Sequence, residues 1–66
     1  MTNINVAKLN KKYGLSEGFI LGVFDYIKSY GVNDATLTLA LVLEYEENGF
    51  DKSIAKVFIE TYKKCN

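Results

Sequence analysis

The segment GLSEGFI at residues 14–20 and the segment GFDKSIA at residues 49–55 share one outline and lie 35 residues apart. Each begins with a Gly, continues with a large apolar residue and then offers a side-chain cap, Ser16 in the first copy and Asp51 in the second. Gly commonly ends one helix, and Ser and Asp are preferred at the start of the next. An apolar helical run follows each cap. The repeated outline therefore predicts two helical hairpins in tandem.

The apolar spacing along the rest of the chain predicts four helices. One face of a helix is marked by apolar residues at i, i+3, i+4 and i+7. On this pattern the helices run from about Thr2 or Asn3 to Lys12, from Ser16 to about Tyr30, from Asn33 or Asp34 to Glu47, and from Asp51 to about Lys64. The turns between them are short, which favours antiparallel neighbours. We expect an all-α fold, with four short helices as two tandem antiparallel helical hairpins in one compact bundle and a single domain over residues 1–66.

The stretch TLTLALVL at residues 36–43 allows two interpretations. Read with period two, it places four leucines on one face of a strand. Read as a helix, it is apolar on nearly every side. No other segment alternates, and an isolated strand is not stable. A helix is therefore favoured here.

The core is expected to come from the apolar stripes of all four helices. A domain of this size buries only about 60% of the surface that its unfolded chain exposes, so part of the apolar surface stays in water. The expected core residues are Val6, Leu9, Phe19, Ile20, Val23, Phe24, Ile27, Leu37, Leu41, Ile54, Phe58 and Tyr62.

The composition excludes most catalytic and metal chemistry. The chain has no His and one Cys, Cys65, next to its end, so a structural zinc site is excluded and no base can activate the thiol. The carboxylates of Glu44, Glu46 and Glu47 are interpreted as a solvated helix end, because burying charge is costly. No glycine-rich phosphate loop is present. We expect no enzymatic activity, no cofactor and no metal.

The sequence also predicts where the protein acts. No apolar run approaches the roughly 18 residues of a membrane span, and the N-terminus lacks the features of a signal peptide. A lone thiol fits a reducing compartment. A cytoplasmic protein with no membrane association is expected.

The candidate interaction surface combines an apolar helix with a pair of glycines. Leu residues are spread around the third helix, so at least one of them should stay exposed, and exposed apolar patches usually mark interaction sites. Gly18 and Gly22, four residues apart, can form a flat strip along which another helix approaches. The candidate residues are Leu39, Val42, Leu43, Tyr45, Gly18 and Gly22.

These features predict a small helical protein-interaction module or inhibitor, a regulatory protein from a phage or mobile element. It would act by binding itself or a larger protein whose identity the sequence does not reveal. Closed twofold dimers are the commonest self-assemblies, so a homodimer is expected, formed through the third helix or the glycine strip of the second.

Residues 6–27 resemble a helix-turn-helix unit. Gly14 stands in the turn, Leu15 follows it, and Ile20 lies where the second helix would meet the first. The resemblance covers about 20 residues and implies an alternative function, a DNA-binding regulator that uses residues 6–27.

Two departures from that family weigh against nucleic-acid binding. Asn10 stands where the family usually has a small apolar residue, and the second helix carries Asp25 but no basic residue before Lys28. Phosphate contacts need cations, and this chain has zero net charge and no Arg. Nucleic acid is therefore not the expected partner.

A second resemblance, to ubiquitin-associated domains, rests on residues 48–51 with Ala55 five positions after Phe50. These residues look like the second half of that family's Met-Gly-Phe turn and the start of its next helix. Asn48 replaces the Met, and too few residues follow for a third helix. The ubiquitin-binding function of that family is not carried over.

Overall fold

The computed structural model describes residues 5–65, which form four α-helices and one short 3-10 helix. The elements are α1 (Val6–Tyr13), α2 (Glu17–Tyr30), α3 (Asp34–Tyr45), η1 (Glu46–Asn48) and α4 (Lys52–Cys65). No strand forms within the described residues, so the all-α prediction and the helical interpretation of residues 36–43 are confirmed. α1 begins at Val6, and the earlier start expected at Thr2 or Asn3 lies outside the described residues.

Each α-helix begins at a side-chain cap. Asn5, Ser16, Asn33 and Asp51 each accept a hydrogen bond from the backbone N–H three residues later, at 2.9 to 3.3 Å. These bonds satisfy donors that have no partner inside the helix. Ser16 and Asp51 act as the repeated outline predicts.

The turn between α1 and α2 is held by Gly14 and Asn10. Gly14 adopts φ 68° and ψ 21°, a left-handed conformation that suits Gly because it lacks a Cβ, and its N–H donates to the Asn10 carbonyl at 2.8 Å. The side-chain amide of Asn10 in turn donates to the carbonyl of Leu15, across the turn. Asn10 therefore ties the end of α1 to the segment that leads into α2.

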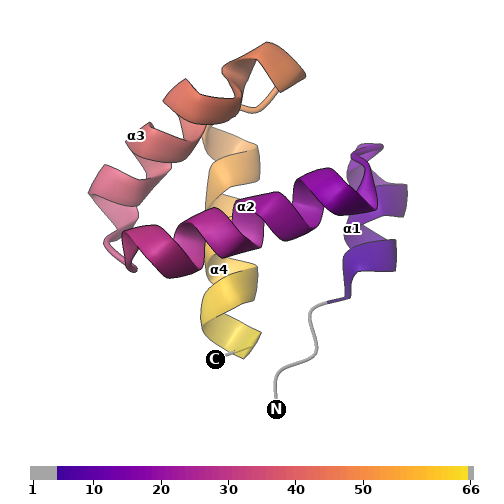
Figure 1. Cartoon of the computed structure of the whole chain (residues 1–66), viewed down its shortest axis with the longest axis horizontal. Helices are drawn as coiled ribbons and strands as arrows, with labels where there is room; N and C mark the ends of the chain where they lie inside the picture. Colours follow the sequence, from indigo (N-terminus) through magenta and orange to yellow (C-terminus); the bar gives the residue numbers. More distant parts are fainter. Residues whose placement is uncertain (1–4, 66) are drawn as a thin grey trace.

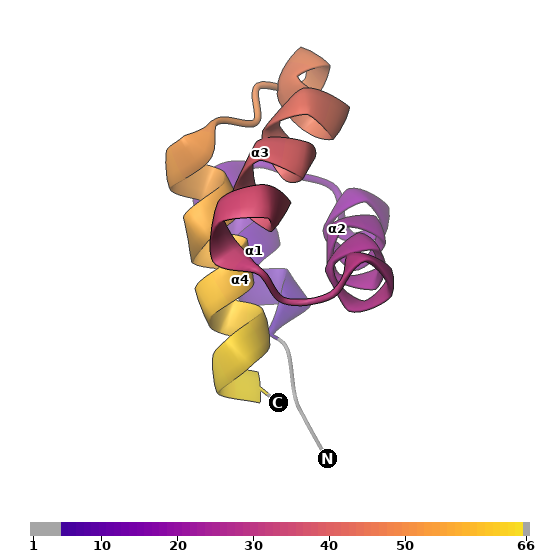
Figure 2. The same ribbon diagram turned by 90° about the vertical axis from the view of Figure 1, so that its left-hand side faces the viewer.

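The helices pack as two consecutive pairs with α2 laid across the others. α1 packs on α2 and α3 packs on α4, which confirms the prediction of a small bundle of four helices, and α2 also contacts α3 and α4. Figure 1 shows α2 running across both α1 and α4, and Figure 2, turned by 90°, views α2 nearly end-on beside the other three helices. The molecule measures 27 × 26 × 17 Å.

The core lies where α2, α3 and α4 meet, with one residue from α1. Eight of the expected core residues are buried, whereas Val6, Phe19, Ile54 and Tyr62 are only half-buried and pack at the edge of the core. Three further apolar residues, Phe50, Ala55 and Ile59, are buried although they are not among the expected core residues. The buried apolar residues are Leu9, Ile20, Val23, Phe24, Ile27, Leu37, Leu41, Phe50, Ala55, Phe58 and Ile59.

Candidate interaction surface

The outward side of α3 carries apolar side chains in water. Leu39 is 56% exposed and Leu43 is 64% exposed, and residues four apart are neighbours on a helix surface. Ala35 and Thr36 are also exposed on this side, one turn before Leu39. We call these four residues, Ala35, Thr36, Leu39 and Leu43, the α3 face. Val42, the third apolar candidate from the sequence, is half-buried and packs against the core.

An open groove of about 680 Å³ runs between α3 and α4, beside the α3 face. Leu39 lines it on the α3 side, and the nearly buried Ile59 (2% exposed) contributes an apolar side chain from α4. The polar residues that line it along α4 are Lys52, Lys56 and Glu60, each about one helical turn after the one before.

The groove has one basic half and one acidic half. Lys52 and Lys56 are exposed and form no salt bridge with any other described residue. Near the other end lie Glu60 and Asp34, and Asp34 pairs with Lys63 at 3.0 Å. Two lysines without a salt bridge therefore stand beside the exposed Leu39, and Glu60 lies one turn beyond Lys56.

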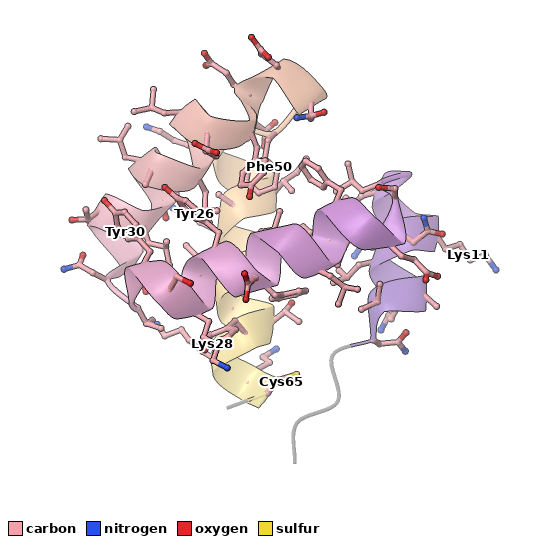
Figure 3. All side chains as sticks on the ribbon, viewed as in Figure 1. Lys11, Tyr26, Lys28, Tyr30, Phe50 and Cys65 are labelled. Carbon is pink, nitrogen blue, oxygen red and sulfur yellow. The ribbon has the colours of Figure 1, made fainter. Side chains whose placement is uncertain are left out.

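Tyr45, also a sequence candidate, lies within an aromatic cluster between α2 and α3. Its ring meets Phe19 edge-on at 5.1 Å and Tyr26 at 6.0 Å, and it is 5.6 Å from Phe50. Figure 3 shows Tyr26, Tyr30 and Phe50 in the space between α2 and the α3–η1 segment. The half-buried Tyr45 therefore supports the packing of α3 on α2, with only part of its surface in water.

Burial changes the acidity of two tyrosines in this cluster. Desolvation, followed by the nearby negative charge of Glu44, raises the pKa of Tyr45 above its ordinary value. The same two causes, in the same order, raise the pKa of Tyr26, with a smaller contribution from Tyr30. Both phenols are therefore kept in the neutral form, which is the form that packs against other rings at least cost.

Gly18 and Gly22 lie exposed on α2, on the side away from the core. A Cβ added at either position would meet no atom within 4 Å, so no other helix of the described chain approaches this strip. Leu21, between them in sequence, is 56% exposed. The strip is thus a second open surface, flat at the glycines and apolar at Leu21.

Three exposed apolar residues were missed by the sequence interpretation: Leu21, Tyr30 and Val32. Leu21 falls outside the core stripe of α2 on a helical projection, so its exposure could have been read from the sequence. Tyr30 stacks on Tyr26 at 5.5 Å near the end of α2, and Val32 lies in the following turn. Their exposure depends on how the chain leaves α2, which periodicity does not encode.

Among residues 5–65, no three His, Cys, Asp or Glu side chains gather in a group that could hold a metal ion. None of the helices in this part of the chain is long and apolar enough to cross a membrane. Comparison with known proteins gives no match to a family model, to a curated protein or to a solved structure.

Proposed function

We propose that this protein is a small helical protein-interaction module, or an inhibitor built on one, that docks through the α3 face. The observation that carries the proposal is the pair Leu39 and Leu43, both more than half exposed and one turn apart. Leaving these leucines in water is unfavourable for a small domain, because burying one fully stabilises the folded state by roughly 1.5–3 kcal/mol. A partner that covers them would recover that energy.

The form of docking that the sequence predicts is a homodimer. Two surfaces are open to it, the α3 face and the glycine strip with Leu21. The lone Cys65 also supports a reducing, cytoplasmic location for the complex, because no disulfide is possible within one chain.

Sedimentation equilibrium across the micromolar range tests self-association and identifies the surface. Leu39→Gln and Leu21→Gln make a matched pair, because both leucines are 56% exposed and each variant makes the same chemical change on a different surface. Loss of dimer in Leu39→Gln alone supports the α3 face, and loss in Leu21→Gln alone supports the glycine strip. A wild-type monomer near 7.4 kDa at every concentration contradicts the homodimer and leaves a larger protein as the partner.

The DNA-binding alternative has weaker support. The outward side of α2, which a helix-turn-helix protein would present to the major groove, carries Gly18, Leu21, Gly22 and Asp25. Base edges are read by polar side chains and phosphates are held by cations, and among these four residues only Asp25 is polar and none is a cation. Retention on a DNA column at low salt that is lost as the salt concentration rises would support the DNA-binding alternative.

A further inference from the structure

The groove between α3 and α4 combines two features that call for a partner of specific chemistry. Its α3 side offers the exposed Leu39, and its α4 side offers Lys52 and Lys56, which are exposed and have no acidic partner among the described residues. The two lysines are four residues apart, so they stand on the same side of α4, one turn from each other.

We propose that this groove and the α3 face beside it bind an amphipathic helix from another protein, with apolar side chains on Leu39 in the groove and Leu43 on the α3 face, and acidic side chains opposite Lys52 and Lys56. The proposal rests on the function proposed above for the α3 face and names the class of partner that fits it. The unpaired lysines beside the leucines are the observation that carries it.

The shape of the groove favours a helix as the occupant. Both walls are α-helices, whose backbone groups are hydrogen-bonded within each helix, so the groove offers no strand edge for an extended peptide. A helix satisfies its own backbone groups and presents only side chains, which is what a groove between two helices can receive. The one-turn spacing of Leu39 and Leu43 matches the i, i+4 spacing of anchors on such a helix.

The charges in one half of the groove favour an acidic partner there. Lys52 and Lys56 line that half and form no salt bridge with any other described residue. An acidic helix pairs with both lysines. Its carboxylates belong in the Lys52–Lys56 half, because Glu60 would repel them further along the groove.

Three helix-stabilised peptides of about 14 residues, roughly 21 Å long, test the proposal. They share one apolar stripe and differ only at two positions, one turn apart, that face Lys52 and Lys56; these positions are Glu, Gln or Lys. Fluorescence anisotropy with each labelled peptide measures its affinity for the wild-type protein. The Glu peptide should bind about three- to tenfold more tightly than the Gln peptide at low salt, as expected for two exposed charge pairs, and the Lys peptide should bind least. The preference should shrink as salt screens the charges.

Variants locate the contact. Lys52→Gln with Lys56→Gln should abolish the preference for Glu over Gln while leaving the affinity for the Gln peptide unchanged. The matched control is Lys8→Gln with Lys11→Gln, which removes the same charge from the exposed surface of α1 and should keep the preference. Leu39→Gln with Leu43→Gln should weaken binding of all three peptides.

The outcomes separate this inference from the function on which it rests. Equal binding of the three peptides to the wild type, lost in the leucine variant, overturns the acidic partner and supports the α3 face. A dimer that Leu39→Gln dissociates, with no peptide bound, assigns the face to a second copy and also overturns the inference. A monomer that binds no peptide overturns both the acidic helix and the docking function of the α3 face.

Discussion

Asp34 and Lys63 join the first residue of α3 to the last turn of α4. The Nζ of Lys63 lies 3.0 Å from Oδ2 and 3.1 Å from Oδ1 of Asp34, across 29 residues of sequence. Each charge also lies at the helix end that its sign favours, the negative one at a start and the positive one at an end. The pair shows that α3 and α4 run antiparallel, because it joins the start of one helix to the end of the other.

Replacing Lys63 by Gln is expected to cost little. Lys63 is 49% exposed and Asp34 is 63% exposed, so water screens their attraction, and such pairs are worth about 0–1 kcal/mol. Urea unfolding should show a loss within that range, smaller at high salt. The exposed Lys28→Gln serves as the control for loss of one positive charge. A loss of several kcal/mol would mean that the pair holds α3 in place.

Phe24→Ala is expected to lower the free energy of unfolding by roughly 3–5 kcal/mol, the usual cost of truncating a buried Phe. Phe24 is 5% exposed, and its ring lies 5.1 Å from that of Phe58 on α4, so the variant removes a contact between two helices. For a domain of 66 residues this approaches the whole stability. Thermal unfolding followed by circular dichroism measures it. Leu21→Ala, at an exposed position of the same helix, should change stability little, and similar melting of the two variants would contradict the prediction.

Stability is expected to fall above about pH 10. The folded-state pKa values of Tyr26 and Tyr45 are raised, so their contribution is fully present below the ordinary value near 10 and is lost as the pH rises through the folded values. Tyr45→Phe keeps the ring and removes the ionisable group, so the variant should lose less stability between pH 9 and the alkaline range than the wild type. Urea unfolding at each pH measures the difference. Identical alkaline slopes would mean that Tyr45 ionises freely in the folded state.

The helices of this chain could be predicted because local chemistry specifies them. Ser16 and Asp51 cap their helices as the sequence indicates. The stretch at residues 36–43 was predicted to be helical because no other segment could pair with it as a strand, and it is helical in the structure. Caps, stops and periodicity involve residues only a few positions apart. For this reason they can be read without knowledge of the fold.

The phase of α4 and the burial of Phe50 could not be predicted in the same way. The expected core included Ile54 and not Ala55, whereas Ala55 is fully buried and Ile54 half-buried. Phe50 follows the turn at Gly49 and packs on Phe58 at 5.7 Å. Both results depend on α2 lying across α4, and this crossing is set by contacts between distant residues.

The candidate site was anticipated in part. Leu39 and Leu43 are exposed, as at least one of the α3 leucines had to be in so small a domain. Lys52 and Lys56 were missed as candidates, because their position beside Leu39 depends on the groove that α3 and α4 form together. A lysine on a helix surface has no distinguishing signal in the sequence until its neighbour is known.

Gly18→Ala and Gly22→Ala are each expected to raise the free energy of unfolding by roughly 0.5–1 kcal/mol, because Ala favours a helix more than Gly and its Cβ meets open space. Gly14→Ala is the contrasting control: it should destabilise, since Gly14 has φ 68°. Urea unfolding of the dilute monomer measures all three. If Gly18→Ala stabilises the monomer but abolishes association, another helix packs on the strip. If it stabilises the monomer and leaves association intact, docking is confined to the α3 face.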